Sequence, residues 1–501
     1  MRNRDQLLEG LKEEFDVVII GGGINGAVSA AALSAHGVKV ALLEANDFAS
    51  MTSQESSNMI WGGIKYLQDF EISLVWKLCK SRNQLLKKYP NRVKQIPFFA
   101  VIGPTSPFSR ALGFVGTLVY WGFGRFQTHL PRIYSNSKIA RNYSLLNLSS
   151  AKGAIQYNDA MLLDNDSRFV FEFIKTAEQH GAVTLNYFKV ESARKNDAGW
   201  QINATDQVSH QNWNIKSKIL INATGPFARQ ISDTFEIPTD NEIVISKGVH
   251  LIVPRIETNN KVLAFFDNQG RLFYVLPMHD RTVIGTTDTS AADANVQVTD
   301  EDRDFLLGQA NKNLNLKVPL TKADIISERC GVRPLVVTNG KKLAKVDWIS
   351  LSRKHVVEIN SEKSVISIFG GKLTDCINIG NEIVHGVRKL GIKTYPAKHW
   401  IGEEYPATPN EFFSTVAEFF ATDADRVAEG LWRRHGKESY KILEMWQEKL
   451  DYSQLVFEGL HFTKGELEYI ANNELVVNPE DLLRRRTPIA LLRKDASSTT
   501  S

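Results

Sequence analysis

The sequence has few cysteines, little net charge and no long apolar run. Its three cysteines, Cys79, Cys330 and Cys376, stand far apart and match neither a zinc-ligand spacing nor a CxxC pair. We therefore expect reduced, buried thiols and no metal site. Sixty basic residues against 56 acidic residues leave a net charge of +4, which is too small a surplus to indicate a nucleic-acid partner.

No uncharged stretch is long enough to cross a bilayer as a helix. The nearest candidate is ALGFVGTLVYWGFG, residues 111–124, which Arg110 and Arg125 flank. This composition suits a partly inserted helix at a membrane surface, with the arginines at the headgroups. It suits a core helix of a substrate domain equally well. The first residues, MRNRDQLLEGLKEE, are charged throughout and lack the apolar core of a signal peptide.

What is present indicates a dinucleotide site near the start of the sequence. FDVVII (15–20) has the pattern of a buried strand, and small residues at helical spacing follow it in GGGINGAVSAAALSAHG. VKVALLEA (38–45) has the pattern of a second strand. Because 43% of the residues are hydrophobic, a chain of 501 residues can build two or three domains around such a unit.

The glycines of this unit match the GxGxxG pattern. Gly21 permits the tight turn, Gly23 the close approach of the backbone to a pyrophosphate, and Gly26 the packing of helix on strand. The helix N-terminus presents free N–H groups and partial positive charge to the pyrophosphate. Glu44 ends the second strand, where it can accept hydrogen bonds from a ribose. An acid there favours NAD or FAD over NADP.

Two later segments favour the flavin. KILINATGPFA (218–228) is an apolar strand that ends in a glycine turn, and VISIFGGKLTDCINIGNEIV (365–384) is another strand, a glycine pair and a helix. A site built from three distant parts of the chain indicates a large cofactor that lies across the sheet. We expect Gly370 and Gly371 to open a helix whose N-terminus faces the pyrimidine edge of a flavin.

The remaining sequence predicts two further domains. HLIVP, RLFYVLP and RTVIGTTD have the pattern of antiparallel strands. From about residue 402 the pattern is helical, with a capping box in TKGE (463–466) and a helix start in NPEDLLRRR, where Asn478 is the cap and Pro479 the first helical residue. The basic run Arg484–Arg486 is interpreted as a solvated helix end.

The predicted fold class is therefore an α/β Rossmann-like FAD-binding domain, a mixed α+β substrate domain with an antiparallel sheet, and a C-terminal α-helical domain. We expect a discontinuous FAD-binding domain of residues 14–95, 150–239 and 326–390. Residues 96–149 and 240–325 would form the substrate-binding domain, and residues 402–496 the C-terminal helical domain.

Over nearly its whole length the chain resembles the FAD-dependent glycerol-3-phosphate dehydrogenases and the related glycerophosphate oxidases. The resemblance is carried, in order along the chain, by GGGINGA (21–27), Thr52, Ser53, Ser56 and Ser57, GG.KYL (62–67), INATGP (221–226), KG.H..VPR (247–255), IGTTD (284–288), GVRPL (331–335), FGGKLT (369–374) and DLLRRRT (481–487). These motifs mean little singly, but together they are specific.

The resemblance implies hydride transfer from carbon 2 of glycerol 3-phosphate to flavin N5, which gives dihydroxyacetone phosphate. It implies quinone as the electron acceptor, with oxygen as the alternative, and a cytoplasmic protein held peripherally on the inner face of the membrane. A homodimer is compatible with it. It implies catalytic roles for His250, Arg333 and Lys372 and substrate contacts from Lys65, Tyr66 and Thr374. Imidazole suits a general base, and a guanidinium suits a phosphate.

The same resemblance implies a set of cofactor-binding residues. They are Gly21, Gly23, Asn25, Gly26, Glu44, Thr52, Ser53, Ser57, Gly62, Gly63, Val190, Gly225, Gly371 and Leu373. In this set, the pair Gly62 and Gly63 would let the backbone pass close under the flavin ring.

The sequence departs from the family pattern at Trp61 and Lys65 and again at Asp375, Cys376 and Ile377. Trp61 stands where a histidine is usual, and Lys65 where an arginine is usual. Lysine keeps the charge and loses the bidentate fork. No histidine or cysteine remains in this segment, so we expect FAD to be bound non-covalently. Asp375 adds a carboxylate that must point away from a phosphate or pair with Lys372. These changes leave open another substrate for the same fold: a hydroxy acid, a polyol phosphate or an amine.

Overall fold

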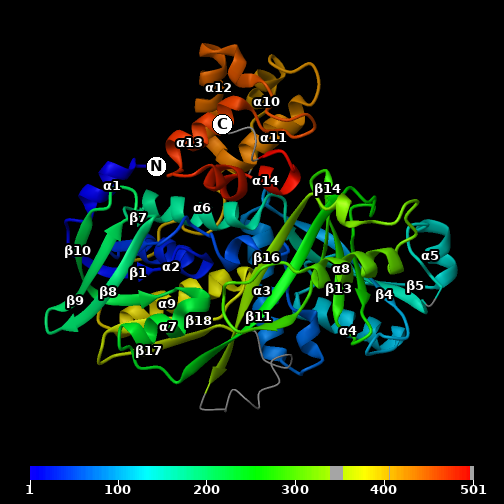
Figure 1. The fold of residues 1–501 in the computed structure, drawn as a ribbon, viewed down its shortest axis with the longest axis horizontal. Coiled ribbons are helices and arrows are strands. Elements are labelled where there is room, and N and C mark those ends of the chain that lie inside the picture. The colour runs from blue at the N-terminus through cyan, green and yellow to red at the C-terminus, as the bar shows by residue number, and fades with distance from the viewer. Residues whose placement is uncertain (150, 339–353, 406, 497–501) are drawn as a thin grey trace.

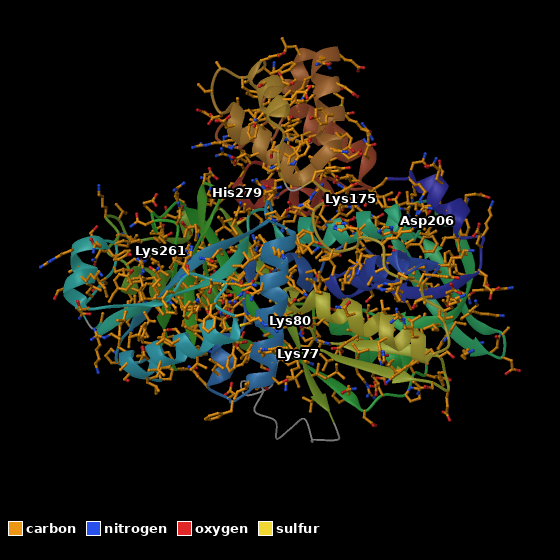
Figure 2. All side chains as sticks on the ribbon, turned by 180° about the vertical axis from the view of Figure 1, so that it is seen from behind. Lys77, Lys80, Lys175, Asp206, Lys261 and His279 are labelled. Atoms are coloured by element: carbon orange, nitrogen blue, oxygen red, sulfur yellow. The ribbon has the colours of Figure 1, made fainter. Side chains whose placement is uncertain are left out.

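The computed structural model describes residues 1–149, 151–338, 354–405 and 407–496. Two β-sheets lie side by side, and the C-terminal helices form a lobe above them (Figure 1). Seen from behind, His279 and Lys175 lie at the base of that lobe (Figure 2). Residue 150 and residues 339–353, which fall in the ranges expected for the FAD-binding domain, lie outside the described residues.

The first sheet is built around the predicted dinucleotide unit. Its described strands have the order β17-β18-β10-β1-β2-β7, with β8 and β9 extending it beside β10. Neighbours from β18 to β7 are parallel. Their bounds are β1 (Phe15–Ile20), β2 (Val40–Leu43), β7 (Val183–Leu185), β8 (Phe188–Asn196), β9 (Gly199–Asp206), β10 (Asn212–Asn222), β17 (Val356–Asn360) and β18 (Val365–Phe369).

Both faces of this sheet are covered, which explains the continuous apolar run of β1. Val17 and Ile19 pack into one core with α2 (Ile24–Ala35), α6 (Asp166–Gln179) and α9 (Cys376–Lys389). Val18 and Ile20 pack into another core on the opposite face, with α1 (Arg4–Gly10). Because successive strand residues point to opposite faces, a stretch buried on both sides, here Val17–Ile20, is apolar at every position.

The second sheet carries the opposite wall of the site. Its described strands have the order β15-β11-β14-β13-β12-β4-β6-β3, with β16 beside β11 and β5 beside β6. Their bounds are β3 (Met59–Ile60), β4 (Val93–Ile102), β5 (Arg132–Tyr134), β6 (Gly153–Leu162), β11 (Asn241–Pro254), β12 (Val262–Phe266), β13 (Leu272–Met278), β14 (Arg281–Gly285), β15 (Thr289–Ala291) and β16 (Ser327–Thr338).

The three strands predicted from HLIVP, RLFYVLP and RTVIGTTD lie in β11, β13 and β14, and β14 pairs antiparallel with each of the other two, as expected of an antiparallel sheet. The register of β11 with β16 places His250 opposite Arg329 and Ser246 opposite Arg333. Strands β3 and β6 fall in ranges expected for the FAD-binding domain, yet both pair within the second sheet. The domain boundaries stay a prediction, and strand pairing would shift them at these two strands.

Residues 111–124 form a surface helix, α4 (Arg110–Phe123). Its inner face buries Thr117 and Tyr120. Its outer face leaves Leu112 63%, Val115 54% and Val119 47% exposed. The helix is therefore not a fully buried core helix. In the parts of the chain that the structure describes, no helix combines the length and apolar character needed to span a membrane.

The C-terminal lobe is helical, as predicted. Thr463 caps α13 by accepting from Glu466 N at 3.2 Å, and a helical turn begins at Pro479. The remaining bounds are α3 (Ile72–Lys88), α5 (Asn136–Asn142), α7 (Ala228–Thr234), α8 (Asp300–Asn313), α10 (Asn410–Ala417), α11 (Ala424–His435), α12 (Ser439–Glu448), α13 (Lys464–Asn473), the π-turn η10 (Asp481–Arg486) and α14 (Ile489–Leu492).

The interpretation of Arg484–Arg486 as a solvated helix end is wrong. The three side chains are only 7%, 4% and 1% exposed, in chain order. Each binds acidic or carbonyl oxygens of segments far away in the sequence, among them Asp47 and Gln54. A local pattern of charges cannot reveal partners that only the fold brings together.

Candidate functional site

Two neighbouring cavities lie where the sheets meet. The first has a volume of about 390 Å³ and is walled by the ends of β1, β2 and β10. The second, of about 290 Å³, lies against β11 and β16. Both include Ile24, Thr52, Ser53, Pro334 and Gly371 in their walls. Because the cavities share these walls, one elongated ligand can extend from the first into the second.

The glycine turn after β1 has the close approach that a nucleotide site requires. Gly21 has φ +105°, and a Cβ there would lie 2.6 Å from the carbonyl oxygen of Ala223. Gly23 lines the first cavity, where Ser53 Oγ accepts a hydrogen bond from Ile24 N at 3.0 Å. The first turn of α2 therefore opens into the cavity with its N–H groups near the wall, an arrangement that favours an anion.

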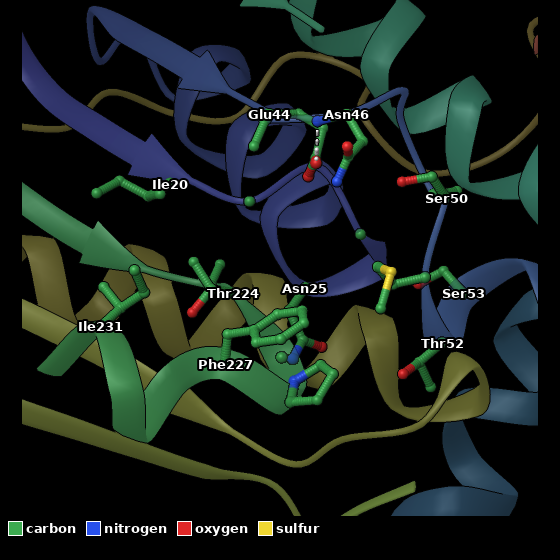
Figure 3. A pocket seen from close by; sticks show the side chains of 18 of the residues that line it. Ile20, Asn25, Glu44, Asn46, Ser50, Thr52, Ser53, Thr224, Phe227 and Ile231 are labelled. Carbon is green, nitrogen blue, oxygen red and sulfur yellow. Dashed lines mark hydrogen bonds between the residues drawn. The ribbon is translucent and has the colours of Figure 1, made fainter. Parts of the chain in front are cut away.

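Polar groups in the first cavity fit an adenosine and a pyrophosphate. Glu44 accepts from Gly22 N at 2.6 Å and from Asn46 N at 2.8 Å, and it lies across the cavity from Thr224 and Phe227 (Figure 3). Burial raises the pKa of Glu44 above its usual value. Asn25 Oδ1 is buried without a hydrogen-bond partner among the described residues. Such an acceptor is expected where a bound molecule supplies the donor.

Most of the predicted cofactor residues meet at these cavities. The first cavity is lined by Gly21, Gly23, Asn25, Glu44, Thr52, Ser53, Val190, Gly225 and Gly371. The second is lined by Thr52, Ser53, Ser57, Gly371 and Leu373. The structure brings into neither wall the remaining three, which are Gly26, Gly62 and Gly63.

Gly62 has a packing reason for its lack of a side chain. A Cβ there would lie 2.9 Å from Cys79 Sγ and closer still to the Tyr120 hydroxyl. Gly62 N donates to Asp159 Oδ1 at 3.2 Å, and Asp159 also binds Arg82 at 2.9 Å and the Tyr120 hydroxyl at 2.6 Å. This buried network fixes the turn between Trp61 and Lys65 from behind.

Arg333 lies on the wall of the second cavity, as predicted. Its Nη2 donates to Thr286 Oγ1 at 2.8 Å, and its Nη1 lies 3.1 Å from Asp288 Oδ1. A Cβ on Gly248 would lie 2.6 Å from Nη1, so the guanidinium needs a glycine on β11 beneath it. The fork is thereby held in one orientation at the cavity, which suits it to a planar or tetrahedral anion.

His250 lies on the same wall, with its ring packed against Gly285. The side chain is buried, and Nδ1 has no hydrogen-bond partner among the described residues. Burial, with Arg333 and Arg329 adding to it, lowers the pKa of His250 to about 3. The imidazole is therefore neutral at physiological pH and able to accept a proton.

The predicted substrate contacts line the same cavity as Arg333. Lys65, Tyr66, Lys372 and Thr374 all belong to its wall. Lys372 Nζ donates to the Tyr66 hydroxyl and lies 3.9 Å from the centroid of the Tyr66 ring. Thr374 Oγ1 accepts from Trp61 N at 3.0 Å, so its hydroxyl holds the backbone of the segment that carries Lys65.

Asp375 does not face the second cavity. Its Oδ2 binds His355 Nδ1 at 2.5 Å, and its Oδ1 accepts from Asn378 Nδ2 at 2.7 Å. His355 Nε2 lies 3.1 Å from Glu382 Oε2. Burial opposes the charge of His355, but both carboxylates outweigh it and raise the pKa of His355 to about 9. The extra carboxylate noted in the sequence is thus neutralised behind the site.

Sequence reasoning did not single out three polar residues on the second cavity: Glu55, Arg271 and Tyr274. Arg271 binds Asp267 Oδ2 at 2.8 Å and the carbonyl oxygen of Asp288 at 3.2 Å. Burial raises the pKa of Glu55 to about 6, although Arg484 and Arg329 lower it. Nothing local distinguishes Arg271 from any arginine at the start of a strand. Glu55 stood inside a recognised serine pattern and could have been flagged there.

Comparisons with known proteins agree with this geometry. A family described as "FAD dependent oxidoreductase" matches residues 16–356, and one described as "C-terminal domain of alpha-glycerophosphate oxidase" matches residues 397–500. A probable mitochondrial glycerol-3-phosphate dehydrogenase of Caenorhabditis elegans is 30% identical and covers 97% of this chain and 69% of its own. An aerobic glycerol-3-phosphate dehydrogenase of Staphylococcus aureus is 28% identical, and the match covers 97% of this chain and 88% of the relative.

Among solved structures, a glycerol-3-phosphate dehydrogenase of Bacillus halodurans complexed with FAD superimposes with a TM-score of 0.76 at 24% identity. The match covers 99% of this chain and 90% of that one. At this identity the likeness concerns the fold. The predicted fold class is confirmed.

Proposed function

The chain belongs to the FAD-dependent oxidoreductase family, and from that premise we propose that it oxidises sn-glycerol 3-phosphate to dihydroxyacetone phosphate. The prediction of FAD as cofactor is confirmed by the family. The observation that carries the proposed substrate is the second cavity, whose wall includes Arg333, Lys65, Lys372 and a neutral histidine, His250. Relatives named glycerol-3-phosphate dehydrogenases support it.

The first cavity supplies what holding FAD requires. The turn at Gly21 and Gly23 and the start of α2 would hold the pyrophosphate, Glu44 would accept from a ribose, and Asn25 offers an unpartnered acceptor. When bound, FAD supplies the hydride acceptor for the oxidation of an alcohol. The shared wall of the two cavities lets a ring held at Gly371 and Thr52 meet a substrate in the second cavity.

The second cavity suits a small dianion. Glycerol 3-phosphate carries nearly two negative charges at neutral pH, and the cationic side chains that line this cavity, Arg333, Lys65 and Lys372 among them, lower the free energy of that charge. Arg333 offers a fork already oriented by Asp288, while Lys65 and Lys372 act as point charges. We assign the phosphate to this group of cations.

His250 is the proposed general base. In the oxidation the C2–H bond breaks with its electron pair leaving as hydride, and the proton of the C2 hydroxyl passes to the imidazole of His250. Burial lowers the pKa of His250 in the free protein, and the positive charge of Arg333 and Arg329 lowers it further. A bound dianion offsets that charge and raises the pKa of the imidazole, so substrate binding makes His250 a stronger base.

The test is anaerobic reduction of the flavin. Purified protein mixed with millimolar glycerol 3-phosphate without oxygen should lose its visible flavin absorbance, and dihydroxyacetone phosphate should appear in equal amount. An unchanged spectrum would reject the proposed substrate. A panel of glycerol, other polyol phosphates, hydroxy acids and amines serves as the control, since bleaching by one of these alone would identify the alternative substrate that Trp61 and Lys65 leave open.

We propose quinone as electron acceptor and α4 as the element that meets a membrane surface. The support is the row of apolar side chains on its outer face, Leu112, Val115 and Val119, together with Arg125 beside the exposed Trp76. Lys77 and Lys80 follow on α3 (Figure 2). Apolar residues bordered by cations suit an anionic lipid surface.

A vesicle experiment tests this surface. Leu112→Glu with Val119→Glu should release the protein from vesicles of anionic lipid and slow reduction of a membrane quinone, while reduction of the flavin by substrate is unchanged. Val318→Glu is the matched control, since Val318 is 76% exposed and belongs to the segment after α8, outside α4. Equal vesicle binding by the unmodified protein, the double variant and the Val318 control would contradict the assignment of α4 to the membrane surface.

A further inference from the structure

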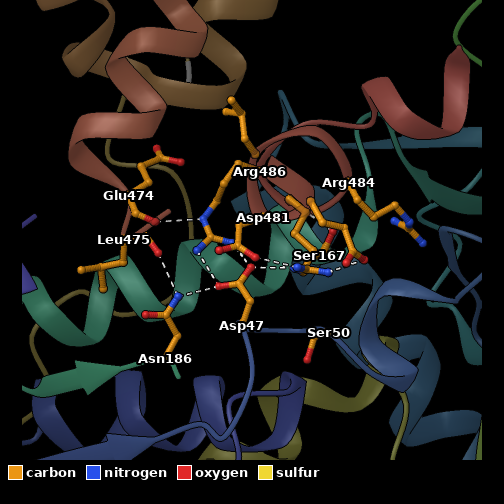
Figure 4. Close-up of polar contacts among 12 residues, drawn as sticks. Asp47, Ser50, Ser167, Asn186, Glu474, Leu475, Asp481, Arg484 and Arg486 are labelled. Atoms are coloured by element: carbon orange, nitrogen blue, oxygen red, sulfur yellow. Dashed lines mark hydrogen bonds and ion pairs between the residues drawn. The ribbon is translucent and has the colours of Figure 1, made fainter. Parts of the chain in front are cut away.

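The arginine run of residues 484–486 is buried against the loop that follows Glu44 (Figure 4). Asp47, at the start of that loop, is 1% exposed and is bound by two of the arginines. Arg486 Nη1 and Nη2 bind the two Asp47 oxygens at 2.8 and 2.9 Å, and Arg485 Nε binds Oδ2 at 2.7 Å. Asn186 Nδ2 adds a fourth hydrogen bond at 2.8 Å.

The third arginine of the run holds the other end of the same loop. Arg484 donates to the carbonyl oxygen of Gln54 and to Glu55 Oε1, the latter at 3.2 Å. Between these two anchor points, the loop contributes Ala49, Ser50, Met51, Thr52 and Ser53 to the wall of the first cavity. The part of the loop that meets the cofactor is therefore held at both ends by one short segment of the C-terminal lobe.

That segment is itself rigidly held. Arg485 also binds Asp481 Oδ1 at 2.6 Å and Glu480 Oε1 at 2.8 Å, while Arg486 Nε donates to the carbonyl oxygen of Glu474 at 3.1 Å. Each arginine thus bridges the C-terminal lobe and the cofactor loop. Charge-assisted hydrogen bonds with a guanidinium fix direction as well as distance.

The charges also matter to Glu44. Burial opposes the charge of Asp47, but Arg486 and Arg485 outweigh it and lower the pKa of Asp47. The Asp47 charge lies near Glu44, whose own pKa burial raises first and Asp47 raises further. Two arginines against Asp47 therefore compensate a negative charge that would otherwise repel the ionised form of the ribose-binding acid.

We propose that Arg484, Arg485 and Arg486 form a positioning clamp for the cofactor loop, so that retention of FAD depends on a segment 430 residues further along the chain than the loop itself. A loop ordered by the clamp loses no further conformational freedom when FAD binds. A loop released from the clamp must be ordered by FAD itself, which weakens binding. The clamp touches no reacting atom and acts only through the loop.

Release of FAD from the holoenzyme tests the clamp. Arg486→Lys and Asp47→Asn should each speed the first-order release of FAD on dilution by about tenfold, as expected when a bidentate charge-assisted pair is lost. Recovery of free flavin fluorescence measures the rate. Arg433→Lys is the matched control, because Arg433 also joins the lobe to the main body, through Asp164 at 2.7 Å, without touching the loop.

A second measurement needs no substitution. Since binding is reciprocal, added FAD should slow amide hydrogen exchange in residues 481–487 of the unmodified chain as well as in residues 44–55. The proposal is overturned if the clamp variants release FAD no faster than Arg433→Lys, or if exchange in residues 481–487 is the same with and without FAD.

Discussion

Arg333 and Asp288 form an ion pair on the wall of the second cavity, with 3.1 Å between Nη1 and Oδ1. Asp288 accepts from Nη1 of the guanidinium, and Thr286 Oγ1 accepts from Nη2. The carboxylate thus orients the arginine before an anion arrives and competes with that anion once it binds. Because lysine has the charge of arginine but lacks its planar fork, substitution at this position separates the effect of charge from the effect of orientation.

Arg333→Lys should reduce kcat/KM for glycerol 3-phosphate by about 100-fold, because lysine keeps the charge and cannot form the oriented fork. The flavin should stay bound, as its absorbance would show. Arg255→Lys is the control, since Arg255 forms an exposed pair with Glu257 just beyond the end of β11. Loss of flavin from the Arg333 variant would mean that the residue supports the fold rather than the substrate.

His250→Asn should slow reduction of the flavin by substrate by about 10²- to 10⁴-fold, the usual contribution of a general base. Stopped-flow absorbance under anaerobic conditions measures this rate directly. His279→Asn is the matched control, because burial also lowers the pKa of His279, to about 4, at the base of the C-terminal lobe away from either cavity. Equal rates of flavin reduction in the two variants would mean that His250 is not the general base.

Gly62→Ala should destabilise the protein by about 1–3 kcal/mol, because the added methyl would overlap Cys79 and the Tyr120 hydroxyl in a closely packed core. Gly116→Ala on α4 should instead stabilise the protein. A Cβ there meets nothing within 4 Å, and alanine favours a helix over glycine by about 0.5–1 kcal/mol. Urea unfolding of both variants measures these changes in the free energy of unfolding. An unchanged free energy in Gly62→Ala would contradict the close packing around Gly62.

His355 should make stability depend on pH. Its folded pKa is about 9 against 6.5 for the free side chain, so the stabilisation is complete below pH 6.5 and is lost as pH rises through 9. His355→Gln should therefore lower the melting temperature most at pH 6 and least near pH 10. His385→Gln, at an exposed position on the same helix as Glu382, is the control for replacement of a histidine on this helix. A difference independent of pH would exclude the ion pair.

The local sequence pattern was enough to predict the first strands of the first sheet and the glycine turn between strand and helix. An apolar strand, glycines at GxGxxG spacing and an acid after the next strand are neighbours in sequence and in space, so Gly21 and Glu44 were identified correctly as neighbours in one cavity. The family, the FAD cofactor and the fold class were also predicted correctly. The roles of individual site residues remain predictions, although the structure brings most of them to the two cavities.

What sequence reasoning missed depends on long-range pairing. The basic run at Arg484–Arg486 looked like a solvated helix end because its acidic partner Asp47 lies more than 400 residues away. Gly62 was assigned to the flavin, whereas the structure gives it a packing partner in Tyr120. Periodicity and spacing describe the environment within a few turns of chain, and neither contains the identity of a side chain that arrives from another element.

The span of the first cavity along the sequence determines when, during translation, all of its wall residues are present. Its wall includes residues from Ile20 to Gly371, and β18, which ends just before Gly370, pairs in parallel with β10 of the first sheet. At about 5–20 residues per second, the ribosome needs roughly 20–70 s to travel from the first of these residues to the last. The nascent chain therefore carries an incomplete nucleotide fold for most of its translation, and the vitamin-derived cofactor can be loaded only near the end.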